Sequence, residues 1–188
     1  MAQSKYSLDS FWDECAEIGD RETDQWEFVY KCEVNDEIYK ECVDFNNWTV
    51  YSWADVDFPG RYSHTPTKET FPATTKWIED KGYRHPELMR LDPGAHIDPH
   101  IHDFKEHIPY MYNMCINQPK DCKFGILPAG IIPYTAGDIY KIDIYADHSV
   151  KNESNEARYH LLFQEKIASI DFTSAEVQSF WVDGKMRK

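Results

Sequence analysis

The sequence lacks long apolar runs and is short of positive charge. No stretch of 18 apolar residues occurs, so nothing in it predicts a membrane span. Residues 1–20 are polar and acidic, without the apolar stretch of a signal peptide. Against 33 acidic residues stand 20 lysines and arginines, and the formal net charge is −13. This balance argues against partners such as nucleic acid or an anionic membrane, although a local basic pocket for a small anion remains compatible with it.

Cysteines are few, and their spacing is not that of a metal or redox motif. Their number is odd and no two form a C-x-x-C pair; they are Cys15, Cys32, Cys42, Cys115 and Cys122. A reducing compartment explains this usage most simply, so we expect a cytoplasmic protein. Cys115 and Cys122 are formal candidates for metal ligands, but buried thiols that act as small hydrophobic side chains are more common.

What the chain does contain is enough apolar material for one folded unit. Hydrophobic residues make up 41% of its 188 residues and aromatic residues 15%, which supports a packed core. We expect a single domain over residues 1–188. Within it we expect a mixed helical and strand part at 1–87, a β-core at 88–166 and a C-terminal extension at 167–188.

The first half of the chain predicts helices and little sheet. Ser10 is placed to cap a short helix, and Asp36–Phe45 has helical spacing of its apolar residues. Pro72–Gly82 predicts a helix that ends at its glycine. Trp26–Val34 alternates as a strand does, and Pro59–Pro66 has the composition of a loop.

After about Leu88 the pattern changes to short β-branched and aromatic runs separated by turns. Pro93-Gly94 and Ala136-Gly137 are examples of the turn signals. The runs are Met89–Leu91, Ala95–His102, Tyr110–Ile116, Lys123–Leu127, Asp138–Tyr145 and Tyr159–Gln164. Strands at this spacing predict an antiparallel sandwich or barrel, so the expected class is mostly β with N-terminal helices.

The histidines suggest a metal site. His100 and His102 stand two residues apart, so on a strand they would share a face and could chelate one ion. His148, distant in the sequence, could supply a third ligand and leave other coordination positions open. Imidazoles with open positions suit iron, and also zinc, copper or nickel. Solvated surface histidines are the simpler alternative for a single His-x-His pair.

The register of the first histidine strand stays open. His96 and Asp98 have the same parity as His100 and form a second possible chelate. Pro99 interrupts backbone pairing and could mark a bulge that changes the register. Asp103, of opposite parity, is a weaker candidate.

Two segments resemble the aspartyl/asparaginyl β-hydroxylase family. The first is Leu91-Asp-Pro-Gly-Ala-His-Ile-Asp-Pro-His100, in which a Pro-Gly turn leads to Pro-His. The second runs from Gly137 to Arg158 and carries His148, then valine, asparagine, serine and an arginine ten residues after the histidine. The second segment is the more specific, and the resemblance covers about residues 88–164.

The resemblance implies a double-stranded β-helix, also called a jelly roll, with Fe(II) as metal and 2-oxoglutarate as co-substrate. It implies an oxidoreductase, a dioxygenase that hydroxylates an aliphatic carbon of a small-molecule or peptide substrate, usually on an amino-acid side chain. His100, His102 and His148 would bind the metal. Arg158 would pair with the distal carboxylate of 2-oxoglutarate through its two-pronged guanidinium, and Asn113 could assist it.

The chain departs from the usual pattern at one ligand. Most 2-oxoglutarate oxygenases have Asp or Glu two residues after the first histidine, whereas this sequence has His102. A neutral imidazole in place of a carboxylate raises the charge of the site by one unit, which should favour an anionic co-substrate. It also admits zinc, because three histidines suit that metal.

Two other functions compete with this interpretation. Gly94, His100, His102 and Glu106 match the first motif of a three-histidine cupin, although Asn113 stands where its closing glycine belongs. Such a cupin could be a dioxygenase without 2-oxoglutarate, an isomerase or a binding module, and it would not need Arg158. An acidic interaction protein on a jelly-roll scaffold is the third possibility, because a fold does not determine a function.

Overall fold

The computed structural model describes residues 2–18, 25–53, 56–102, 110–165, 181–182 and 185–186. Asp103, Glu106 and most of the expected C-terminal extension lie outside these residues. Within the described part of the chain, no helix combines the length and the apolar character needed to cross a membrane.

Three helices lie close to where the sequence predicts them. They are α1 (Leu8–Ile18), α2 (Asn35–Asp44) and α3 (Pro72–Lys81). α3 begins with a proline and ends before Gly82, whose φ of 70° is the left-handed conformation that glycine adopts at low cost. Glu41 of α2 accepts hydrogen bonds from the backbone N–H groups of Ala73 and Thr74 and thereby caps α3. In α1 the capping hydroxyl belongs to Ser7 rather than to Ser10, whose N–H donates to it.

The remaining elements are strands, all paired antiparallel. They are β1 (Ala2–Gln3), β2 (Trp26–Lys31), β3 (Thr49–Trp53), β4 (Val56–His64), β5 (Arg84–Leu91), β6 (His96–Ile101), β7 (Tyr110–Cys115), β8 (Cys122–Ile126), β9 (Gly130–Ile131), β10 (Asp138–Asp143), β11 (His148–Asn152), β12 (Arg158–Gln164), β13 (Trp181–Val182) and β14 (Lys185–Met186). The mostly β class with N-terminal helices is therefore confirmed.

The order of the strands defines the fold. From β5 to β12 the chain passes between two sheets, so that one contains the order β10-β7-β12-β5 and the other β6-β11-β8-β9. This exchange between facing antiparallel sheets is the jelly-roll topology, as the resemblance implied. β2, β3 and β4, from the first half of the chain, extend the larger sheet to seven strands, and β1 extends the smaller to five.

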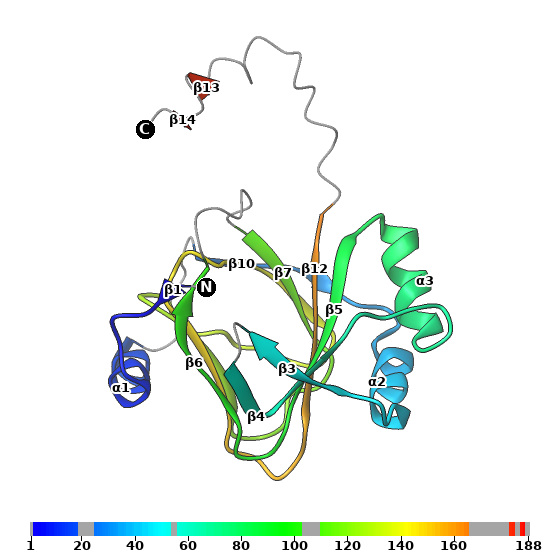
Figure 1. Cartoon of the computed structure of the whole chain (residues 1–188), viewed down its shortest axis with the longest axis horizontal. Helices are drawn as coiled ribbons and strands as arrows, with labels where there is room; N and C mark the ends of the chain where they lie inside the picture. The colour runs from blue at the N-terminus through cyan, green and yellow to red at the C-terminus, as the bar shows by residue number, and fades with distance from the viewer. Residues whose placement is uncertain are drawn as a thin grey trace.

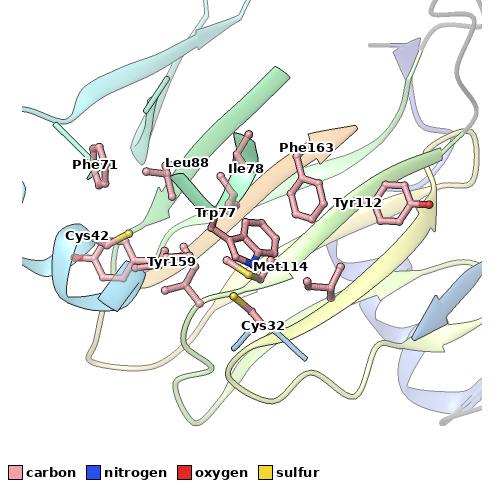
Figure 2. Packing of buried hydrophobic residues seen from close by; sticks show 14 residues of the cluster. Cys32, Cys42, Phe71, Trp77, Ile78, Leu88, Tyr112, Met114, Tyr159 and Phe163 are labelled. Carbon is pink, nitrogen blue, oxygen red and sulfur yellow. The ribbon is translucent and has the colours of Figure 1, made fainter. Parts of the chain in front are cut away.

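Three apolar clusters pack the helices and the two sheets together. α2 and α3 cover the outer face of the larger sheet through a cluster that includes Trp77, Leu88 and Phe163 (Figure 2). α1 lies on the opposite side of the molecule, beside β6 (Figure 1), and contributes Phe11 and Cys15 to a smaller cluster. A third cluster lies between the two sheets. All five cysteines are buried and unpaired, in agreement with thiols used as core side chains.

The interval Pro59–Pro66 was predicted as a loop, and that prediction is wrong. Residues up to His64 belong to β4, which pairs with β5. Gly60 makes the strand possible despite its turn composition, because a Cβ at this position would lie 2.7 Å from the Cβ of Ala95. Its carbonyl accepts a hydrogen bond of 2.8 Å from the N–H of Asp92. The close approach of two backbone segments thus overrides the local turn signal.

Candidate functional site

A cavity of about 140 Å³ opens between the two sheets. Both sheets contribute to its wall, and they contribute different chemistry. The predicted site residues that line it are His100, His102 and His148 on the side of the smaller sheet, and Asn113 and Arg158 on the larger one. The five residues that the family resemblance assigns to the metal and to the co-substrate therefore line one pocket.

The three histidines converge at one end of this pocket. Their candidate ligand atoms all lie within 4.8 Å of one another. The ring centroids of His100 and His148 are 4.2 Å apart, and that of His102 lies 5.3 Å from that of His148. Small ring rotations would bring all three nitrogens to about 2.1 Å from one ion.

A bulge in β6 selects which residues of the histidine strand face inward. His148 is paired with His100, but Val150 is paired with Ile97, so the register shifts between them. Pro99, which lies in this interval, donates no backbone hydrogen bond. The alternative chelate points elsewhere: His96 and Asp98 contact each other at 3.2 Å, and their side chains are 47% and 67% exposed.

Hydrogen bonds to the backbone orient two of the imidazoles. The Nδ1 of His100 donates to the carbonyl of Asp98, and the Nδ1 of His148 donates to that of Ala146, each at 2.8 Å. A carbonyl can only accept, so Nδ1 carries the proton and Nε2 presents its lone pair. A fixed tautomer of this kind is what metal-binding histidines require.

Burial keeps these imidazoles neutral. Burial is the main cause that lowers the pKa of His100 to about 4; the Asp98 carbonyl opposes this shift, and the neighbouring His102 and Arg61 add to it. For His148, burial and the neighbouring His100 hold the pKa well below its usual value. Metal ligands are neutral imidazoles, so His100 and His148 are in the protonation state that coordination needs.

The larger sheet contributes a cluster of buried polar side chains. Arg158 is only 5% exposed, Asn113 5% and His160 1%. The guanidinium Nη2 of Arg158 donates to Nδ1 of His160 at 3.0 Å, and the amide of Asn113 contacts the same ring nitrogen. The Nε of Arg158 and the Nε2 of His160 are buried without a hydrogen-bond partner. A buried guanidinium with an unsatisfied donor is costly unless an anion pairs with it.

Phe124 is a neighbour of both clusters. Its ring stacks parallel to His148 with centroids 6.0 Å apart, and the guanidinium carbon of Arg158 lies 6.0 Å from the same ring. The arginine cluster and the histidine cluster are therefore distinct groups that line one pocket, an arrangement that suits a ligand with two acidic ends.

Two pocket residues were missed in the sequence. His160 stands within the apolar run of β12, where a histidine is indistinguishable from a core residue. Arg61 is 3% exposed, and its guanidinium lies 4.8 Å from the ring centroid of Tyr51. It belongs to the segment expected to be a loop, so only knowledge of β4 could have identified it. Cys115 and Cys122 are buried, and among the described residues the metal-binding group consists of the three histidines alone.

Comparison with solved structures supports the topology. A prolyl-4-hydroxylase from Pseudomonas putida superposes with a TM-score of 0.54 at 12% identity, over 81% of this chain and 99% of that one. An oxidoreductase of the 2OG-Fe(II) oxygenase family from Burkholderia pseudomallei gives 0.52 at 11% identity, over 87% and 93%. At such identities the likeness concerns the fold alone. No curated protein matches the sequence.

A family model gives the more specific result. The model described as aspartyl/asparaginyl beta-hydroxylase matches residues 11–166, which is most of the chain and includes both histidine strands and Arg158. The resemblance noted over residues 88–164 is therefore confirmed and extends to the N-terminal helices. The chain belongs to the aspartyl/asparaginyl β-hydroxylase family, and it is an oxygenase of the 2-oxoglutarate-dependent kind.

Proposed function

We propose that this protein is an Fe(II)- and 2-oxoglutarate-dependent dioxygenase that hydroxylates an aliphatic carbon of an amino acid or a peptide side chain. Family membership supplies the class of reaction. The observation that carries the specific proposal is the pocket with three imidazoles on the side of the smaller sheet and a buried guanidinium on the side of the larger one. A keto acid with a distal carboxylate has the matching chemistry.

In this proposal the three histidines hold the metal. His100 and His148 present Nε2 because their Nδ1–H groups are engaged by backbone carbonyls. His102, the residue directly after β6, supplies the third nitrogen. Iron and 2-oxoglutarate together would reduce dioxygen, so that one oxygen atom enters a substrate C–H bond and the other enters succinate as CO₂ is released. Three neutral ligands leave the metal its full charge, which favours binding of a dianionic co-substrate.

Arg158 and Asn113 hold the other end of the co-substrate. The guanidinium would donate hydrogen bonds to the distal carboxylate in a desolvated environment, where a charge-assisted hydrogen bond is strong. Asn113 contacts His160, which contacts Arg158, so its amide orients the cluster. A cupin that does without 2-oxoglutarate would have no use for a buried arginine at this position, and the burial of Arg158 therefore favours the oxygenase.

The substrate class rests on Arg61. Its buried guanidinium lines the same pocket, and its charge reaches His100, whose pKa it lowers. A cation beside the metal ligands suits a carboxylate on the molecule to be hydroxylated, such as that of an amino acid. Tyr51, stacked against the guanidinium, holds it in place.

The decisive experiment is an anaerobic titration of the Fe(II)-loaded protein with 2-oxoglutarate. We expect the weak visible charge-transfer absorption of a bidentate keto-acid complex to appear and to saturate. His148→Ala is expected to abolish it by removing a metal ligand, whereas His96→Ala, a change to an exposed side chain on β6 outside the pocket, should leave it intact. Wild-type protein that binds iron but develops no absorption would exclude the proposal.

A further inference from the structure

A second polar side chain, that of His160, lies beside Arg158 on β12. His160 lies two residues after Arg158, so both side chains project from the same face of the strand into the pocket. His160 is 1% exposed, and neither its Nε2 nor the Nε of Arg158 has a hydrogen-bond partner. Two unsatisfied polar atoms in one buried cluster require an explanation, because each costs free energy unless something pairs with it.

The hydrogen-bond partners of His160 indicate which of its two ring nitrogens carries the proton. A guanidinium has five donors and no acceptor, so Nδ1 of His160 must accept the 3.0 Å hydrogen bond from Arg158. The amide oxygen of Asn113 contacts the same nitrogen. Since a nitrogen that accepts from Arg158 cannot also donate to this oxygen, the assignment requires a half-turn of the amide plane, which places the NH₂ group of Asn113 there. Burial and the nearby Arg158 lower the pKa of His160, so the ring is neutral. Its single proton is therefore on Nε2.

We infer that His160 is a positioning residue for the co-substrate: its neutral Nε2–H donates to the distal carboxylate that Arg158 binds. The inference rests on the proposed function, since it concerns the same pocket and the same ligand class. It adds that the anion site consists of a charged donor and a neutral donor, with Asn113 fixing the tautomer. Tyr134 packs edge-to-face on the His160 ring at a centroid distance of 5.0 Å and keeps the ring plane fixed.

Two variants of His160 distinguish the effect of its N–H donor from the effect of its packing. His160→Gln keeps an N–H near the position of Nε2, whereas His160→Leu keeps bulk and removes the donor. Loss of one hydrogen bond to a charged group should weaken 2-oxoglutarate binding to the Fe(II) protein about 10- to 100-fold in His160→Leu. His160→Gln should stay within about fivefold of wild type. Leu161→Val, on the opposite face of the same strand, controls for a general disturbance of β12 and should bind as wild type does.

A second readout uses no metal. In metal-free protein labelled with ¹⁵N-histidine, the NMR spectrum should show His160 protonated at Nε2. Addition of glutarate, a dicarboxylate without the keto group, should shift that N–H resonance and leave the signal of exposed His96 unchanged. This arm tests His160 even if the iron complex fails to form, so failure of the inference and failure of the proposed function can be told apart.

The outcomes are distinct. Weak binding in His160→Leu with near-normal binding in His160→Gln supports the inference, as does the glutarate-induced shift. Wild-type affinity in His160→Leu overturns it, and so does equal weakening in both variants, because donation is then not the relevant property. A proton found on Nδ1, or no response of His160 to glutarate, overturns it as well.

Discussion

At the scale of single residues, Arg158 separates the two leading functions. Its guanidinium is buried on the larger-sheet side of the pocket and has an unsatisfied Nε. Truncation to alanine would leave a bound carboxylate buried without its partner, a loss of about 3–5 kcal/mol. We therefore expect Arg158→Ala to lower 2-oxoglutarate affinity by about two to four orders of magnitude.

The conservative variant sharpens this test. Arg158→Lys should recover only part of the loss, because an ammonium group cannot reproduce the two-pronged geometry of a guanidinium. The affinity for Fe(II) should hardly change in either variant, since Arg158 is not a metal ligand, and isothermal titration with each ligand measures both. Equal 2-oxoglutarate affinity in wild type and Arg158→Ala would favour the cupin alternative.

The three histidines are not equivalent as ligands. His148 is buried, and His100 and His102 are both partly buried. His100 is paired with His148 within the sheet, whereas His102 follows the last residue of β6, so water can replace the ligand at position 102 more readily. We expect His102→Ala to weaken Fe(II) binding less than His100→Ala, as measured by metal content after dialysis against a competing chelator. If His96→Ala or Asp98→Ala proved more damaging than either, the ligand set would be wrong.

At the scale of elements, the docking of α1 on the smaller sheet depends on one glycine. A Cβ on Gly125 of β8 would lie 2.9 Å from the Sγ of Cys15 and 3.0 Å from ring atoms of Phe11 and Trp12. Gly125→Val should therefore overpack this contact and lower the free energy of unfolding by about 1–3 kcal/mol. Urea denaturation measures the change.

Lys123 supplies the control for this prediction. It lies on the same strand and, two residues away, on the same face as Gly125, but is partly exposed. Lys123→Val should shift the free energy of unfolding by no more than about 0.5 kcal/mol. Wild-type stability in Gly125→Val would mean that α1 does not pack tightly against β8.

Elements also show what sequence patterns can and cannot predict. The helix ending at Gly82 and most of the strands after residue 88 follow from local signals, namely a C-terminal glycine, alternation and turns. β4 does not, because its turn-like Pro59-Gly60 is accommodated only by pairing with β5 and by close contact with Ala95. Long-range pairing overrides local propensity here, and Arg61 was missed for that reason.

The site shows the same division. Sequence spacing and family resemblance predicted His100, His102, His148, Asn113 and Arg158, and the fold brings all of them to one pocket. Which parity of the histidine strand faces inward could not be decided, because it depends on the bulge at Pro99. His160 could not be recognised either, since only its burial beside Arg158 distinguishes it from a core residue.

At the scale of the whole molecule, the two sheets contribute different parts of the site. The smaller sheet carries His100 and His148, and the larger one carries Arg158, His160 and Asn113. A ligand that reaches from the metal to the guanidinium would connect the two sheets across the jelly roll. The chain as a whole carries a formal charge of −13, so attraction of an anion must come from this enclosed local field rather than from the surface.

The buried histidines also make the stability of the whole fold depend on pH. Folding lowers the pKa of His160, because burial and the neighbouring Arg158 both oppose its protonation. Above the unfolded pKa of about 6.5 the ring is neutral in both states, and its contribution to stability is fully present. As the pH falls below 6.5 the unfolded chain takes up the proton and the folded chain does not, so stability is lost.

His160→Gln removes this titration without removing a hydrogen-bonding side chain. The free energy of unfolding of metal-free wild type should therefore fall more steeply from pH 7 to pH 5 than that of the variant, by up to about 1.4 kcal/mol per pH unit. Urea denaturation at several pH values measures the two slopes, and His100 and His148 contribute equally to both proteins, so the difference isolates His160. Parallel slopes would show that His160 takes up protons in the folded state, which would contradict its assignment as a neutral donor inside the pocket.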